Sequence, residues 1–267
     1  MTQEYSPAGQ PIIQLRSVSK TFSRGGKLNR AVDSVSFSIA AGETIALVGE
    51  SGSGKTTVSR IALGLVKPDE GDVLLQGEKL YEMNADALRT KRTAMQPVFQ
   101  DSGAAFNPRR TIQQILFQAI EANPVRESDP HRKAVQLLDS VRLGPGEDFL
   151  RRFPHELSGG QRQRLAIARA VAVGPKLIVA DEPLSGADVT IRGQVLNLLL
   201  DLQAQSQLAY LFVTHDIAIA RAFAHRVIVM YKGQVVEQGT AEEVVGNPKH
   251  AYTQRLVSSA LRFTEVG

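Results

Sequence analysis

The sequence predicts an α/β fold with a parallel sheet and crossover helices. After residue 160, segments with helical spacing alternate with short apolar segments, as they do where helices connect parallel strands. A glycine-rich loop lies between a predicted buried strand and a predicted helix. A stretch with mostly helical spacing interrupts this order, and it predicts a helical insertion.

The composition bounds the class of protein. The chain has 267 residues, 43% of them hydrophobic, enough for the core of one large α/β domain. It has no cysteine, which excludes disulfides, thiolate zinc sites and iron–sulfur ligation. Its net charge of +4 includes no long basic run, so we expect no nucleic-acid arm. The apolar runs have strand length and residues 1–11 are polar, so we expect no membrane span, no signal peptide and a cytosolic location.

The N-terminal third predicts strands followed by a helix. Alternating polarity indicates half-buried strands, and a continuous apolar run indicates a buried one. Proline and glycine at 68 and 71 end the helical pattern. We predict strands over residues 12–18, 32–39, 44–48 and 73–76, a loop over 23–29 and a helix over 55–66.

The rest of the chain predicts the insertion and then the alternating part. Apolar residues recur with helical spacing at Ile112, Ile115, Leu116 and Ala119, and again from Val135 to Val141. Later segments predict helices over 161–173, 191–205 and 217–224, strands over 177–180, 210–213, 227–230 and 235–237, and a closing region over 241–261.

One loop has the pattern of a nucleotide-phosphate site, G-x-x-x-x-G-K-[ST]. It consists of Gly49, Glu50, Ser51, Gly52, Ser53, Gly54, Lys55, Thr56 and Thr57. Glycines let backbone N–H groups converge on phosphate oxygens, and the helix start adds the positive end of its dipole. The pattern assigns Lys55 to the β- and γ-phosphates and the Thr56 hydroxyl to Mg²⁺. An ordinary glycine-serine turn is the alternative, but the flanking strand and helix favour this phosphate loop.

A second glycine segment also starts a predicted helix. It consists of Leu157, Ser158, Gly159, Gly160 and Gln161. Ser158 is a helix-capping residue type, and the two glycines leave backbone donors exposed to an anion. An ordinary capped helix is the alternative.

Acidic residues and a histidine follow two of the predicted strands. Asp181 and Glu182 end one strand, where Asp181 would lie near a metal beside Thr56 and Glu182 could polarise a water. Such acids also often cap the next helix, and the phosphate loop favours the catalytic interpretation. His215 follows a second strand, where a structural role is the alternative.

Taken in order, these segments resemble the ATP-binding subunit of an ABC transporter, over about residues 12–261. The resemblance implies a P-loop NTPase fold with a RecA-like core, an antiparallel β subdomain and an inserted helical subdomain. It implies a flexible N-terminus (1–11), an ATPase domain (12–246) with its insertion at about 102–164, and a C-terminal extension (247–267).

The resemblance also implies roles, with ATP and Mg²⁺ as cofactors. Residues 49–57 would be the Walker A loop and 157–161 the signature segment. The other implied roles are the Walker B aspartate for Asp181, catalytic base for Glu182, Q-loop residue for Gln100, D-loop residues for Ser185 and Asp188, switch histidine for His215 and adenine-stacking aromatic for Phe22. Phe22 also fits a core aromatic. The D-loop departs from the family's Ser-Ala-Leu-Asp at Gly186 and Ala187, so we expect altered communication between sites.

A shared site and a transport role follow from the same resemblance. Residues 157–161 of one subunit would close on ATP held by residues 49–57 of a second ATP-binding subunit. Residues 99–109 and 247–256 are similar to the peptide and nickel importer branch, with Ala251 in place of a proline. The implied partners are membrane permease subunits and, indirectly, an extracytoplasmic solute-binding protein, with no nucleic acid.

The implied function is import of a di- or oligopeptide, nickel or a chelated metal, powered from the cytoplasmic face of the inner membrane. Two alternatives remain open. One is a soluble ABC ATPase acting on DNA or ribosomes, although the chain has neither a long coiled coil nor tandem ATPase domains. The other is a regulatory nucleotide-binding module without turnover.

Overall fold

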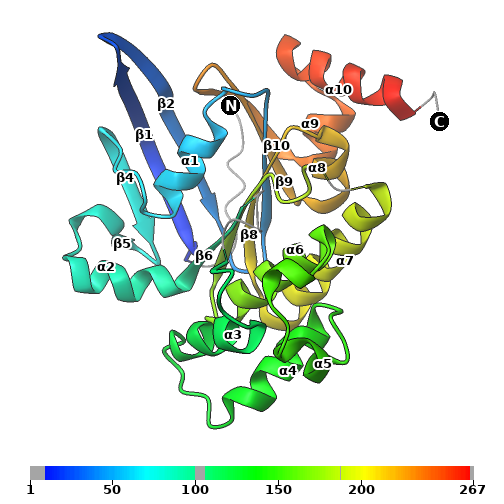
Figure 1. Ribbon diagram of the computed structural model, residues 1–267. Coiled ribbons are helices and arrows are strands. Elements are labelled where there is room, and N and C mark those ends of the chain that lie inside the picture. The colour runs from blue at the N-terminus through cyan, green and yellow to red at the C-terminus, as the bar shows by residue number, and fades with distance from the viewer. Residues whose placement is uncertain (1–9, 100–105, 187, 265–267) are drawn as a thin grey trace.

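The chain forms two sheets with helices packed around them (Figure 1). The computed structural model describes residues 10–99, 106–186 and 188–264. A four-stranded antiparallel sheet has the order β2-β1-β4-β5, and a six-stranded sheet has the order β10-β9-β3-β8-β7-β6. The predicted α/β class is therefore confirmed, together with its antiparallel β part.

The antiparallel sheet contains a hairpin longer than the sequence predicts. Its strands are β1 (Ile13–Arg24), β2 (Lys27–Ile39), β4 (Glu70–Leu75) and β5 (Glu78–Lys79). The expected loop over 23–29 is wrong, because β1 and β2 continue through it and join at a two-residue turn. Gly25 and Gly26 form this turn with φ of 57° and 78°, a left-handed backbone that glycine adopts without a steric penalty.

The six-stranded sheet is parallel except at one edge, where β10 pairs antiparallel with β9. Its strands are β3 (Thr44–Val48), β6 (Met95–Phe99), β7 (Leu177–Asp181), β8 (Ala209–Thr214), β9 (Arg226–Tyr231) and β10 (Gln234–Thr240). Every residue of β3, β7 and β8 is buried, as is typical of a sheet covered on both faces. Strand β6 was not predicted. It contains Pro97, which is tolerated because β6 is an edge strand.

The helices surround this sheet. They are α1 (Lys55–Ala62), α2 (Ala85–Lys91), α3 (Ile112–Glu121), α4 (Pro130–Ser140), α5 (Gly146–Leu150), α6 (Gly159–Ala172), α7 (Val189–Ser206), α8 (Ile217–Phe223), α9 (Ala241–Gly246) and α10 (Ala251–Thr264). Helices α3 to α5 lie together at the bottom of Figure 1, and α10 lies at its upper right. Short 3₁₀ turns occupy Leu80–Glu82, Arg92–Ala94 and Pro154–Glu156.

Alternate residues of the central strands enter different cores. On β7, Ile178 and Ala180 pack with residues of helices α3 to α7, whereas Leu177 and Val179 pack with α1 and the antiparallel sheet. A third core lies between β3 and β9 and the three C-terminal helices α8, α9 and α10. The sheet is therefore fixed from both sides, and the loops at its edge start from rigid strands.

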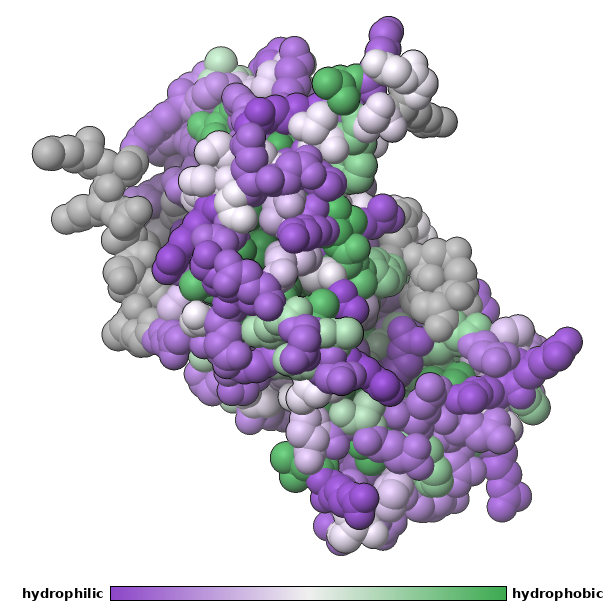
Figure 2. Space-filling view, turned by 90° about the vertical axis from the view of Figure 1, so that its left-hand side faces the viewer, coloured by the Kyte–Doolittle hydropathy of each residue, from purple (hydrophilic) through white to green (hydrophobic). Residues whose placement is uncertain are grey.

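None of the described helices is long and apolar enough to cross a bilayer. Figure 2 shows the face that carries the antiparallel sheet, turned towards the viewer. Hydrophilic residues cover most of the coloured part of this face, and the hydrophobic ones form small separate patches between them.

Three parallel strands end at the same edge of the sheet, and each leads into a segment that the sequence singled out. Val48 of β3 is paired with Thr214 of β8, and Asp181 of β7 is paired with Val213 of β8. The phosphate loop, the two acids and His215 therefore leave the sheet side by side, at the carboxyl edge where α/β proteins bind ligands.

Candidate nucleotide site

The phosphate loop connects β3 to α1 and packs tightly against neighbouring backbone. A Cβ atom added at Gly49 would lie 2.3 Å from the carbonyl oxygen of Met230, and one at Gly54 would lie 2.3 Å from that of Ala31. Gly54 also has φ of 106°, which L side chains rarely adopt. Glycine is therefore required at both positions by the fold as well as by the pattern.

Lys55 is folded under this loop. Its Nζ donates hydrogen bonds to the carbonyl oxygens of Gly49, at 2.6 Å, and Glu50, at 2.9 Å. Burial lowers the pKa of Lys55, while the carboxylates of Glu182, Asp181 and Glu50 act in the opposite direction. The ammonium group thus lies beneath the loop, beside the carboxyl edge of the sheet.

The loop has the features of an anion cradle. A Cβ atom added at Gly52 would meet no atom within 4 Å, so this part of the loop is open. The hydroxyl of Ser53 is buried and has no hydrogen-bond partner among the described residues. An open glycine backbone, an unpaired hydroxyl and an ammonium group together fit a phosphate chain.

Oxygen donors beside the loop fit a magnesium ion. Thr56 Oγ1 lies 3.5 Å from Asp181 Oδ1, at the limit of a hydrogen bond. Burial raises the pKa of Asp181, and Glu182 raises it further, against the opposing effects of Thr56 and Lys55. A hydroxyl and a carboxylate are ligands that Mg²⁺ prefers. The third predicted ligand, Gln100, lies outside the described residues.

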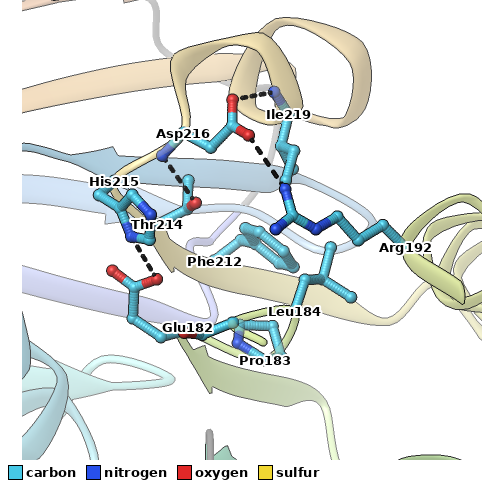
Figure 3. A pocket seen from close by; sticks show the side chains of 10 residues that line it. Glu182, Pro183, Leu184, Arg192, Phe212, Thr214, His215, Asp216 and Ile219 are labelled. Carbon is cyan, nitrogen blue, oxygen red and sulfur yellow. Dashed lines mark hydrogen bonds and ion pairs between the residues drawn. The ribbon is translucent and has the colours of Figure 1, made fainter. Parts of the chain in front are cut away.

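Glu182 and His215 form a pair at the mouth of a small pocket (Figure 3). His215 Nδ1 lies 2.8 Å from Glu182 Oε2. The backbone of Glu182 has φ of 50°, an uncommon conformation for a residue other than glycine. Its N–H donates to the carbonyl of Val213, which ties this strained residue to β8. The carboxylate is therefore held at the sheet edge by both its backbone and the histidine.

The same pocket contains a link that the sequence analysis did not predict. Asp216 Oδ1 accepts hydrogen bonds from the N–H groups of Ala218 and Ile219, which caps α8. Its Oδ2 lies 3.6 Å from Arg192 Nη1 on α7. A dashed line marks this ion pair in Figure 3. The capping position is readable from sequence because an aspartate precedes a helical pattern. The Arg192 partner has no local signal, and it connects α7 to the segment that carries His215.

The remaining predicted residues lie on other segments, and Ser185 lines the pocket of Glu182 and His215. Ser158 and Gln161 form a capping box at the start of α6, and residues 157–161 make no hydrogen bond to residues 49–57 in the part of the chain that the structure describes. Asp188 Oδ1 caps α7 by accepting from the N–H of Ile191. Phe22 on β1 is 41% exposed, with Lys20 Nζ 5.7 Å from its ring centre. The roles assigned to these residues stay predictions.

Replacing His215 with alanine should lower kcat for ATP hydrolysis about 100-fold, with a smaller change in the KM for ATP. The substitution leaves the Glu182 carboxylate without its partner and, in the role predicted for His215, removes a contact to the γ-phosphate. Phosphate release under saturating ATP measures the effect, and His131→Ala on the exposed start of α4 is the matched control. A kcat equal to that of the wild type would remove His215 from the site.

Comparison with known proteins decides the family. Residues 32–185 match the family model described as ABC transporter. The chain belongs to the ABC transporter family. It is 43% identical over 259 residues to the glutathione import ATP-binding protein GsiA of Salmonella paratyphi A, a match that covers 94% of this chain and 41% of that protein. It thus spans about two fifths of the length of GsiA.

Two further relatives support membership of the ABC family. The chain is 42% identical over 252 residues to the dipeptide transport ATP-binding protein DppF of Lactococcus lactis, covering 93% of this chain and 80% of DppF. A solved dimeric structure of the ATP-binding cassette MJ0796, bound to ADP and Pi, is 31% identical, with a TM-score of 0.75. That match covers 86% of this chain and 98% of the MJ0796 chain. The predicted ABC ATPase fold and the similarity to the peptide importer branch are therefore confirmed.

Proposed function

We propose that this chain is the ATP-hydrolysing subunit of an importer for di- or oligopeptides or related small solutes. The convergence of Lys55, Thr56, Asp181, Glu182 and His215 at one edge of the sheet carries the proposal. GsiA is a glutathione import protein and DppF a dipeptide transport protein, and both support the solute class. Nickel or a chelated metal is the other solute that the branch suggests. No observation favours a soluble ATPase that acts on DNA or ribosomes.

In the proposed reaction, Glu182 acts as the base. Its carboxylate takes a proton from the water that attacks the terminal phosphorus of ATP, while His215 holds the carboxylate in place. The bond from that phosphorus to the β-phosphate oxygen breaks, so that ADP and phosphate are the products. The backbone N–H groups of residues 49–57 and the Lys55 ammonium bind the phosphates. Thr56, Asp181 and Gln100 would hold Mg²⁺, which supplies positive charge against the phosphate oxygens when bound.

We further propose that a complete site requires two ATP-binding subunits. Residues 157–161 lie at the start of α6, where the capping box bonds the N–H groups of Ser158 and Gln161. Among the described residues the segment makes no hydrogen bond to the phosphate loop. A head-to-tail partner would bring this segment onto the nucleotide. The dimeric form of the MJ0796 cassette supports this arrangement. The partner is either a second copy or a related chain.

A groove beside β6 is proposed as the contact for a cytoplasmic segment of the permease. It has a volume of about 520 Å³ and is lined by residues of β6, α3 and α6. Arg169 lies over the ring of Phe106 at 4.9 Å, and Arg110 and Gln118 add polar groups. Because α6 lines this groove, a movement of α6 on ATP binding would be transmitted to a permease segment bound there, at the cytoplasmic face. In this proposal residues 12–246 are the ATPase domain and 247–267 its C-terminal extension.

The test is capture of tagged Glu182→Gln protein, with ATP, from membranes of the cells that make it. Two permease subunits and an ATP-binding chain, identified by mass spectrometry, are expected. Lys55→Ala protein is the control and should capture less of the second ATP-binding chain. Uptake of a radiolabelled dipeptide by the complex reconstituted with the wild-type chain then tests the solute class. Capture of ribosomes or DNA without any permease would contradict the transport proposal.

A further inference from the structure

One hydroxyl group connects the C-terminal segment to the phosphate loop. The Oη atom of Tyr252, in the first turn of α10, accepts a hydrogen bond from the backbone N–H of Glu50 at 2.9 Å. The two residues are 202 positions apart in the sequence. The tyrosine is 2% exposed, so its ring is buried while its hydroxyl reaches the loop.

The position of this ring is fixed by neighbours on β9 and β10. The rings of Tyr231 and Tyr252 have centroids 4.3 Å apart. The Glu237 carboxylate accepts hydrogen bonds from the N–H groups of Lys249, at 2.8 Å, and His250, at 3.0 Å, and so holds the turn before α10. The N–H of Tyr252 itself donates to His250 Nδ1 at 3.2 Å. The hydroxyl is therefore presented from a rigid base.

The group that Tyr252 holds is the same peptide unit that anchors Lys55. The carbonyl oxygen of Gly49 and the N–H of Glu50 belong to one planar peptide group. The carbonyl accepts from Lys55 Nζ at 2.6 Å, and the N–H donates to Tyr252 Oη at 2.9 Å. The peptide is thus held at both ends, and its orientation determines where the ammonium group is placed.

We propose that Tyr252 is a positioning residue of the nucleotide site. It fixes the orientation of the peptide between Gly49 and Glu50, and through that peptide it fixes the ammonium of Lys55 beneath the phosphates. The C-terminal segment thereby contributes to nucleotide affinity without touching the nucleotide. This inference rests on the proposed function, because it assigns a support to the same ATP site.

The test is Tyr252→Phe in the full-length chain, which removes the hydroxyl and keeps the stacked ring. The Kd for MgATP and MgADP by calorimetry and the KM for ATP should rise about three- to tenfold, as the loss of one hydrogen bond predicts. The kcat should stay within about twofold, since the base and its histidine are untouched. Amide exchange at Glu50 should become faster, because its N–H loses its partner.

Tyr231→Phe is the matched control. It removes a hydroxyl from the ring that faces Tyr252, and this hydroxyl bonds to no described residue, so its Kd should equal that of the wild type. An unchanged Kd in Tyr252→Phe, or an equal rise in both variants, would overturn the inference. The proposed function would instead be overturned if the wild-type chain bound no ATP and the Lys55→Ala variant gave the same result.

Discussion

Replacing Glu182 with glutamine is expected to slow ATP hydrolysis by a factor of about 10² to 10⁴, the contribution typical of a general base. The amide has nearly the size of the carboxylate but cannot take a proton from water. The phosphate loop is unchanged, so MgATP binding should persist. The measurement is single-turnover phosphate release, together with the elution volume of the protein in size-exclusion chromatography with MgATP, where a stable dimer is expected.

Glu242→Gln on α9 is the control for this experiment, since it removes an exposed carboxylate that lies at a helix start rather than in the site. It should leave turnover unchanged. Wild-type turnover in Glu182→Gln would exclude Glu182 as the base. Loss of both turnover and MgATP binding would mean that the carboxylate supports the loop rather than the reaction.

Replacing Lys55 with alanine is expected to weaken MgATP binding about 100-fold or more. The change removes charge-assisted hydrogen bonds to the phosphates, each worth about 1.5–3 kcal/mol. It also leaves the carbonyls of Gly49 and Glu50 without their partner and removes the cation beside Asp181 and Glu182. Calorimetric titration with MgATP measures the Kd.

Lys79→Ala is the matched lysine control. Its ammonium pairs with Asp72 and Glu82 on the exposed part of the antiparallel sheet, where such pairs contribute little. Its Kd for MgATP should equal that of the wild type. Normal nucleotide affinity in Lys55→Ala would contradict the assignment of residues 49–57 as the phosphate loop.

Local sequence patterns predicted many residues of the candidate site because each of its parts has a short signature. The phosphate loop, the strand that ends in Asp181 and Glu182, and the strand before His215 are each readable within a few residues. Parallel strands that end at one edge then bring these parts together. The hairpin of β1 and β2 was missed because a glycine pair also occurs in ordinary loops. Pro97 hid strand β6, since proline is disfavoured away from sheet edges.

The contacts that support the site were not predictable from the sequence. Glu50 and Tyr252 meet only after β3, β9 and the C-terminal helices have packed into one core. Arg192 lies on α7 and Asp216 caps α8, so their pairing leaves no periodic signal. The left-handed backbone of Glu182 is a property of the packed strand end, because glutamate has no intrinsic preference for it.

The position of β3 in the middle of the sheet governs the order in which the protein can be assembled during its synthesis. The strand is made early, yet its two neighbours are β8 and β9, whose residues lie more than 150 positions later. Until the ribosome has released residues 209–231, the apolar strand before the phosphate loop has no partner in its sheet. Pairings over such separations form slowly and leave hydrophobic strands open to aggregation. A chain interrupted before residue 209 would therefore contain the whole phosphate loop, but we expect it to be bound by chaperones and not to bind ATP.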